Sequence, residues 1–406
     1  MLTFIPDIAE EHYDELQFLW TQRRKALHSA AYTMREMGML EERIEAHVQG
    51  LLVLGDRMLD FVAGGLAGDD EMPAFASAYS LLRLGTVEAI QRVRDALIGA
   101  EGKRLDGLRE AVAHGPSQPL VPFLQSLFAS AAPPLAVAAG EALAFHRSLQ
   151  LSSEQLVPLL RDELPAVRRG AWRIAAFCGL SLAAPLYETG LRDADPGVQR
   201  AALAAAAWGR YSGWVAHCRA LAEQPSPDAV QPIAMLAAIL PPQEYKAVTA
   251  LASTPAFGPE RYRIAAAFGH PVMLEYLLNE MDNPDAATAA GAAQAFSKML
   301  GVAVPSDRRV AIAPPNGETP TAFDAEFLDE VQLPDVPRAR RHWEDAKPHL
   351  AHASRVAHGI DVSAGITRET FGLLDMESRR EVCLRARLTA GWSGTPLILE
   401  QFPLRA

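Results

Sequence analysis

DELPAVRRGAWRIAA (residues 162–176) and DADPGVQRAALAAAA (residues 193–207) decide the fold of this chain. Each stretch begins with acidic turn residues, continues through proline, valine and arginine, and ends in a run rich in alanine. Proline is tolerated in the first turn of a helix because its missing N–H would have no intrahelical partner there. Alanine is the best helix former. The two stretches therefore predict helices that start at Pro165 and Pro196.

The same pattern recurs along the middle of the chain. Prolines that follow a polar turn stand at Pro134, Pro165, Pro196, Pro227 and Pro259, at intervals of 31, 31, 31 and 32 residues, with a shorter step to Pro284. Between them lie short amphipathic stretches such as SSEQLVPLLRDEL and SLAAPLYETGLRD, with apolar residues at helical spacing. A fixed period of this length is typical of repeat proteins, so each unit is predicted to be a helical hairpin.

The pattern D-x-x-P-x-V-R-R-x-A resembles HEAT repeats, in the short variety first named from phycobilisome lyases, over residues 132–301. The resemblance implies an all-α fold, an α–α superhelix in which neighbouring hairpins share a core. In such arrays, turn aspartates and early arginines bond to adjacent units, so Asp162, Asp193, Arg168 and Arg200 are interpreted as scaffold residues.

The two ends of the chain depart from the repeat. Residues 7–66 predict two long amphipathic helices, which we interpret as the cap that a repeat array needs at its end. After Gly301 the period is lost. The domains predicted are a helical cap at 1–70, a repeat array at 71–301 and an irregular, mostly helical extension at 302–406. Within the extension we expect strands at 309–313 and 397–402 and helices at 338–358 and 378–389.

Composition limits the classes of partner. The 406 residues are 49% hydrophobic and 21% charged, which is typical of a folded globular chain. There are 38 lysines and arginines against 49 aspartates and glutamates, so the net charge of −11 disfavours nucleic acid as a partner. No apolar stretch approaches the roughly 20 residues that cross a bilayer, and no signal sequence is evident. Three widely spaced cysteines fit free thiols, and together these features predict a cytoplasmic protein.

The sequence carries no common catalytic signature. It lacks a P-loop, a G-x-S-x-G, an H-E-x-x-H and paired C-x-x-C motifs, and no histidine is followed directly by glutamate, as the di-iron HEAT hydroxylases require. His349 and His352 lie one turn apart, but two imidazoles alone bind a metal weakly. Cys178, Cys218 and Cys383 are interpreted as idle thiols. We therefore predict no metal, no cofactor and no enzyme activity.

An acidic segment with apolar anchors follows the array. Asp324, Glu326, Asp329, Glu330 and Asp335 are interleaved with Phe323, Phe327 and Leu328. If this segment became helical, the apolar residues would share one face. We interpret it as a strap that packs on its own domain, with docking onto a partner as the alternative.

The inner helices of HEAT arrays usually line a concave face, which makes Arg169, Arg173, Arg261 and Arg263 the candidate contacts for an acidic protein partner. The leader MLEERIEAHVQGLLVLGD, the repeats, and a tail with Trp343, Gly372 and SRREVCLRA together resemble uncharacterised HEAT-repeat proteins encoded in bacterial type VI secretion clusters. That resemblance implies an adaptor or chaperone for a toxin effector or a spike protein. Two alternatives are a cytoplasmic immunity protein that neutralises a cognate toxin, and a lyase-like enzyme of the phycobilisome-lyase type.

Overall fold

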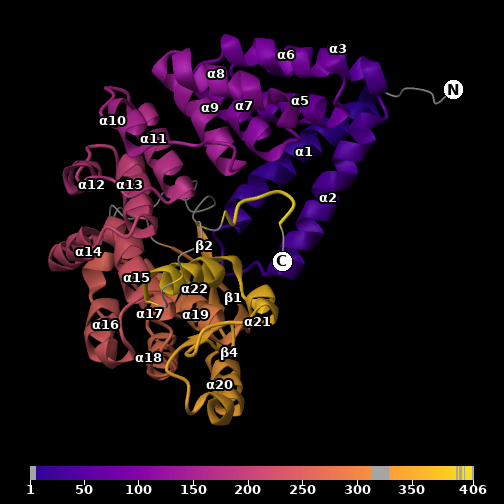
Figure 1. Ribbon diagram of the computed structural model, residues 1–406. Helices are drawn as coiled ribbons and strands as arrows, with labels where there is room; N and C mark the ends of the chain where they lie inside the picture. The colour runs from indigo at the N-terminus through magenta and orange to yellow at the C-terminus, as the bar shows by residue number, and fades with distance from the viewer. Residues whose placement is uncertain (1–5, 313–328, 390–391, 393–395, 397, 405–406) are drawn as a thin grey trace, which may run out of the picture. The chain divides into compact units, whose positions relative to one another are not determined.

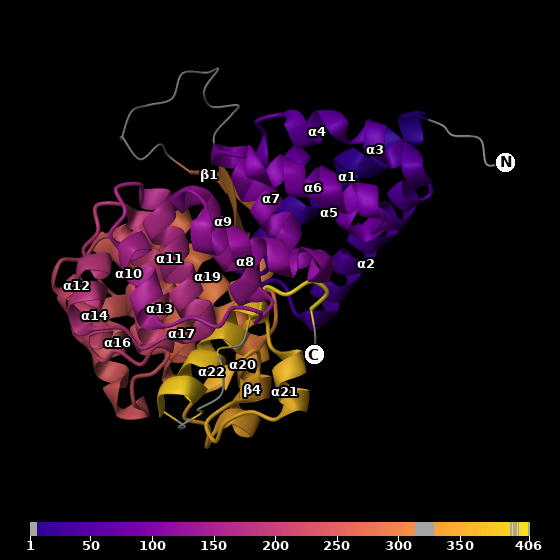
Figure 2. The same ribbon diagram turned by 45° about the horizontal axis from the view of Figure 1, so that its top comes forward.

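The computed structural model describes residues 6–312, 329–389, 392, 396 and 398–404, and it confirms the all-α class (Figures 1 and 2). Its contacts divide the chain into two compact units. Unit 1 comprises Met1–Trp214 and Ser393–Arg405, and unit 2 comprises Val215–Trp392 with Ala406. Unit 2 is therefore inserted, in sequence, between the body of unit 1 and the C-terminal tail. This division by packing differs from the domain boundaries predicted at 70/71 and 301/302.

Unit 1 consists of helices, with the predicted N-terminal pair first. Its α-helices are α1 (Pro6–Ala26), α2 (Met34–Leu52), α3 (Met58–Phe61), α4 (Ala63–Ala67), α5 (Glu71–Leu84), α6 (Val87–Ile98), α7 (Gly102–His114), α8 (Val121–Ser130), α9 (Pro133–Phe145), α10 (Ser153–Leu160), α11 (Pro165–Cys178), α12 (Ala184–Leu191) and α13 (Pro196–Trp208). The two long predicted helices are confirmed as α1 and α2, although the last part of the second lies in the short α3 and α4. Helix α14 (Gly213–Glu223) begins where unit 1 ends.

The repeat appears in unit 1 as a row of helical hairpins. Helices α7, α9, α11 and α13 pack against one another in order, and α8, α10 and α12 each pack on the helix that follows (Figure 1). We call the first set the inner helices and the second set the outer helices. Pro165 and Pro196 occupy the first turns of α11 and α13, as predicted, and Asp195 caps α13 by accepting a hydrogen bond from the N–H of Val198 at 2.9 Å. The hairpin prediction is confirmed here, and a superhelical path remains a prediction.

Close approach between the inner helices requires small residues. Helix α9 is buried on every side from Ala136 to Phe145. A Cβ at Gly170 of α11 would stand 2.1 Å from a methyl carbon of Val137 in α9. The alanine-rich composition of these helices is thus a packing requirement as well as a helix-forming one.

Unit 2 continues the hairpins and adds the C-terminal extension. Its elements are α15 (Val230–Ala237), α16 (Tyr245–Ala252), α17 (Tyr262–Phe268), α18 (Val272–Glu280), α19 (Ala286–Leu300), β1 (Pro305–Ala311), β2 (Glu330–Pro334), α20 (Val336–Leu350), β3 (Val356–Ala357), β4 (Ile360–Asp361), α21 (Arg368–Leu373) and α22 (Met376–Thr389). Pro227 and Pro259 each open a short 3-10 turn ahead of the helix, unlike Pro165 and Pro196. Phe257, Phe268 and Phe296 are fully buried in the main core of the unit.

The extension differs in part from its prediction. The strand expected at 309–313 is found as β1, which pairs antiparallel with β2 and places Val310 opposite Val331, and the helix expected at 378–389 is found as α22. The helix expected at 338–358 is wrong beyond Leu350, because the chain turns back there into β3 and β4. The strand expected at 397–402 is also wrong, since residues 398–402 form a turn and a bend. Residues 323–328 of the acidic segment lie outside the described residues.

Candidate functional site

The four predicted arginines fall into the two units. Arg169 and Arg173 lie on the inner helix α11 of unit 1. Arg261 and Arg263 lie at the start of α17 in unit 2. The structure therefore gives two separate pairs, each of which has its own surroundings.

Arg173 ends a row of charges that crosses three inner helices. Arg109 on α7 is 32 residues before Glu141 on α9, and its Nη1 lies 3.4 Å from the Glu141 Oε2. Arg173 follows Glu141 by the same interval, and its Nε lies 3.2 Å from the same carboxylate. The Glu141 side chain is 5% exposed, whereas that of Arg173 is 42% exposed. Two arginines thus share one buried carboxylate, and the outer one of the two faces solvent.

Arg169 and Arg200 add positive charge beside this row. They occupy the same position of successive repeats, on α11 and α13. Arg169 is half-buried and lies along Gly197 of α13, where a Cβ would stand 3.3 Å from its Cδ. Neither arginine has an ion pair within the described part of the chain. We call Arg169, Arg173 and Arg200 the arginine surface.

The position of Arg200 differs from its prediction. We expected it to be a scaffold residue, but its side chain is exposed. Arg168, one position before Arg169, is the residue that bonds to the next repeat. The first arginine of V-R-R thus bonds to the next repeat, whereas the second arginine has no ion pair in the described part of the chain.

Arg168 confirms the scaffold interpretation. Its Nε and Nη2 donate to the two carboxylate oxygens of Asp193 at 2.7 and 2.8 Å, and its Nη1 donates to the carbonyl oxygen of Asp162 at 2.8 Å. The hydrogen bonds from Arg168 lower the pKa of Asp193. This bidentate pair ties α11 to the turn before α13.

Replacing Arg168 by alanine is expected to lower the free energy of unfolding of unit 1 by about 1–2 kcal/mol, because the charge-assisted hydrogen bonds are lost. Since the pKa of Asp193 is lowered by folding, the stabilisation is present above its ordinary pKa of about 4 and fades as the pH falls further. Urea denaturation at pH 7 and pH 3 measures both effects. The matched control is Arg169→Ala, and an equal loss in that variant would contradict the assignment.

In unit 2, Arg261 is a packing residue. It is 8% exposed, donates to the carbonyl oxygen of Gly258 at 2.9 Å and to the hydroxyl of Tyr262 at 2.8 Å, and lies over the Tyr262 ring. Arg263 is 43% exposed at its side chain, but its Nη2 lies 2.8 Å from Glu377 Oε1 on α22. Both arginines therefore bond to other groups of unit 2, and Arg261 is buried, which leaves the arginine surface of unit 1 as the stronger candidate for a partner.

Arg263 belongs to a buried charge cluster that the sequence did not indicate. Lys298 of α19 is 4% exposed at its side chain, and its Nζ lies 2.5 Å from Glu381 Oε1 and 3.5 Å from Glu377 Oε1. Asp375 is fully buried, accepts a hydrogen bond from the N–H of Ser378 at 2.9 Å and lies 3.7 Å from His358 Nδ1. Three carboxyl groups thus surround one buried lysine where α22 meets α19.

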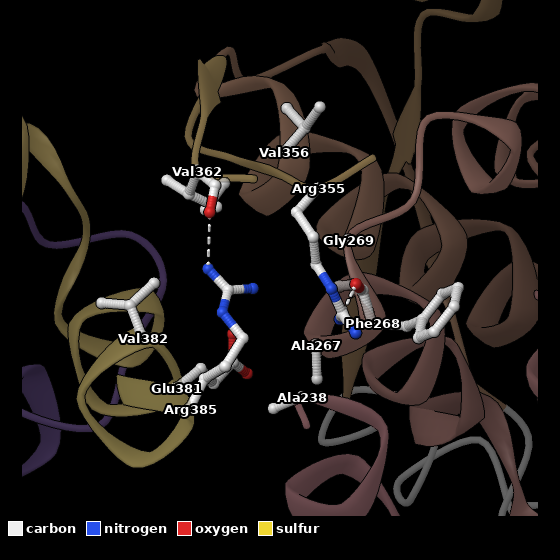
Figure 3. A pocket seen from close by; sticks show the side chains of 12 residues that line it. Ala238, Ala267, Phe268, Gly269, Arg355, Val356, Val362, Glu381, Val382 and Arg385 are labelled. Carbon is white, nitrogen blue, oxygen red and sulfur yellow. Dashed lines mark hydrogen bonds between the residues drawn. The ribbon is translucent and has the colours of Figure 1, made fainter. Parts of the chain in front are cut away.

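A small pocket lies beside this cluster, with about 250 Å³ of space that includes the part open to solvent. Figure 3 shows Arg355 and Arg385 on opposite sides of it, with Glu381 on the same helix as Arg385. Arg385 donates to the carbonyl oxygen of Val362 at 2.9 Å, and Arg355 donates to the carbonyl oxygens of Phe268, Ala237 and Leu240. The pocket side chains therefore bond mainly to backbone, which fixes β3, β4 and α22 on α17.

Burial and the neighbouring cations shift the pKa values of the two glutamates in the cluster in opposite directions. It raises the pKa of Glu381 to about 7, against the attraction of Lys298. Burial also opposes the ionisation of Glu377, but Lys298 and Arg263 outweigh it and lower the pKa of that carboxyl. Of the two glutamates, Glu377 is thus the one that stays ionised and paired with Lys298 and Arg263 near neutral pH.

Glu381→Gln is expected to change how stability depends on pH. Because folding raises the pKa of Glu381 above its ordinary value of 4.5, the native state binds a proton that the unfolded chain releases, and this contribution to stability falls as the pH rises from about 4.5 to 7. The variant should lack that fall. Denaturation midpoints of unit 2 measured from pH 4.5 to pH 8 test this, with Glu377→Gln as the comparison. A fall of unchanged size in Glu381→Gln would show that another group titrates.

Cys178, Cys218 and Cys383 are free thiols. Burial raises the pKa of the Cys218 and Cys383 thiols to about 12 and raises that of Cys178 as well. Over the described residues, no three metal-ligating side chains gather in one place, and none of the helices there has the length and apolarity needed to span a membrane.

The chain was also compared with known proteins. No family model matches it, and no curated protein matches it. A crystal structure described as an engineered protein aligns over 93% of this chain and 98% of its own, at 15% identity and a TM-score of 0.31. A likeness at that TM-score carries no argument about fold or function.

Proposed function

We propose that this protein is a non-catalytic scaffold that binds an acidic segment of a protein partner on the arginine surface. The observation that supports this most is the uncompensated charge at α11 and α13. Arg169 and Arg200 have no ion pair in the described part of unit 1, and Arg173, which pairs with Glu141, is 42% exposed at its side chain. In a chain with a net charge of −11, such a surface attracts acidic groups that the rest of the molecule repels.

The helical framework also suits this role. The inner helices α11 and α13 pack directly against each other, and Arg169 and Arg200 occupy equivalent positions on them. Arginine has a planar group that pairs with a carboxylate through two hydrogen bonds. An extended acidic segment that crosses α11 and α13 would therefore meet Arg169 and Arg200 in turn.

For the biological setting, we propose a cytoplasmic adaptor or chaperone that holds a type VI toxin effector or couples it to the spike protein. This setting rests on the resemblance of the sequence alone. Affinity purification of the tagged protein from its native host, followed by mass spectrometry, tests it. Recovery of spike and effector together supports the adaptor. Recovery of the effector alone, with rescue of its toxicity, indicates immunity instead, and recovery of neither contradicts both roles.

Reversing the charge at Arg169 and Arg200 together is expected to weaken binding of the acidic partner about tenfold or more, which corresponds to about 1.4 kcal/mol or more. Arg173 is left intact because it also neutralises the buried Glu141. Binding should weaken as salt is raised, since exposed charges are screened. Titration calorimetry with the purified partner measures this. Arg192→Glu, at the end of the outer helix α12, is the matched control, and equal losses in the two variants would contradict the proposal.

A further inference from the structure

The C-terminal tail of the chain is held on the N-terminal helices of unit 1. The described residues 398–404 form no helix or strand, yet they contact α1, α2 and α5, more than 300 residues earlier. Upstream, Arg147 at the end of α9 donates to the carbonyl oxygen of Pro396. We call residues 398–404 the tail segment.

The tail segment is recognised mainly through its backbone. Arg23 Nη2 donates to the carbonyl oxygens of Glu400 and Gln401 at 3.1 and 2.8 Å. Glu41 Oε2 accepts a hydrogen bond from the N–H of Leu404 at 2.8 Å. These two side chains also form an ion pair of 2.7 Å, and their side chains are 1% and 7% exposed. Helices α1 and α2 thus supply one hydrogen-bond donor, Arg23, and one acceptor, Glu41, to the main chain of the tail segment.

One side chain of the tail segment completes the contact. The ring of Phe402 lies edge-on to that of Trp20, with centroids 5.2 Å apart, and 6.1 Å from the ring of Tyr79. The guanidinium of Arg23 is 5.0 Å from the Trp20 ring and 5.1 Å from the Phe402 ring, so the cation and the two rings are in mutual contact. The side chains of the groove, Trp20, Arg23, Glu41 and Tyr79, all belong to α1, α2 and α5.

We propose that this groove is a peptide-binding site, which the tail segment occupies in cis and from which a partner segment with an aromatic residue followed by proline displaces it. Main-chain carbonyls and one aromatic ring are features that any extended peptide of this kind presents. The donor and the acceptor lie on helices α1 and α2 and are joined to each other by their own ion pair. This proposal goes beyond the arginine surface and does not depend on it.

The experiment uses the full chain with a specific protease site inserted between Trp392 and Pro396 and cut after folding. A fluorescent peptide of residues 396–406 is then added, and its anisotropy is followed. We expect the labelled peptide to enter the cut protein and to bind the uncut protein at least about 100-fold more weakly, because a tethered tail has an effective concentration on the order of millimolar.

Two peptide variants make the test specific. Phe402→Ala in the peptide is expected to weaken binding at least about tenfold, because the contacts of the ring with Trp20, Arg23 and Tyr79 are lost. Gln401→Ala is expected to change binding less than about twofold, since only the carbonyl of that residue is used. A cut protein that keeps its helical circular dichroism but takes up no peptide, or takes up both variants equally, overturns the proposal.

If cleavage by the protease unfolds the protein, a variant of the uncut protein tests the same proposal. Full-length Phe402→Ala keeps its tail but binds it less tightly, so the wild-type peptide should bind this variant more tightly than it binds the unaltered chain. Equal binding to the two full-length proteins would overturn the proposal as well.

Discussion

Arg23→Ala is expected to destabilise unit 1 by about 3–5 kcal/mol, because it leaves the buried carboxylate of Glu41 without its cation. The carboxylate would keep a single hydrogen bond, from the N–H of Leu404. The variant also removes the two hydrogen bonds to the tail carbonyls and the cation–π contacts with Trp20 and Phe402.

Hydrogen exchange followed by mass spectrometry measures this effect in the right place. Peptides from α1, α2 and the tail should exchange faster in Arg23→Ala, while peptides from unit 2 keep their wild-type rates. The matched control is Arg92→Ala on α6, whose ion pairs with Asp60 and Glu88 are largely exposed and contribute less than about 1 kcal/mol. A loss of stability in Arg23→Ala no larger than that of the control would contradict our account of the tail.

Lys298→Met is expected to cost unit 2 about 3–5 kcal/mol at pH 8, because methionine keeps the volume of the side chain but leaves three buried carboxyl groups with too few cations. Arg263 still pairs with Glu377, so Glu381 and Asp375 are the carboxyl groups that lose most when the lysine is removed. Both can relieve the repulsion by taking up a proton. The loss should therefore shrink by at least half when the pH is lowered to 5.

Thermal and urea denaturation of Lys298→Met at pH 8 and pH 5 measure this difference. Lys347→Met is the matched control, since its ion pair with Glu275 lies on the surface, at 49% and 57% side-chain exposure. A loss that is the same at both pH values would show that the variant disturbs packing and not charge.

The sequence predicted the features that local chemistry controls. A proline after an acidic turn starts α11 and α13, and the alanine-rich runs form the inner helices that pack closely. The same reasoning failed at Pro227, where a 3-10 turn precedes the helix. It also failed beyond Leu350, because apolar spacing continues there although the chain turns back into β3 and β4.

The buried charge cluster and the tail contact could not be predicted from the sequence, because their residues are far apart along the chain. Lys298 and Glu381 are 83 residues apart, and Glu41 and Leu404 are 363 apart. Each residue sits in an ordinary amphipathic helix or loop, and nothing in its neighbourhood marks it as buried. The repeat pattern already separated Arg168, as a scaffold residue, from Arg169, but it did not separate Arg168 from Arg200, whose side chain is exposed.

The contact that we propose is one between the arginine surface and an acidic segment of a protein partner. Its most direct test is a photo-crosslinking amino acid placed at position 169 and, as control, at Glu154 on the outer helix α10 of the same hairpin. With the purified partner present, we expect position 169 to crosslink to an acidic stretch of the partner and position 154 to give no crosslink. Crosslinking from position 154 but not from position 169 would contradict the account.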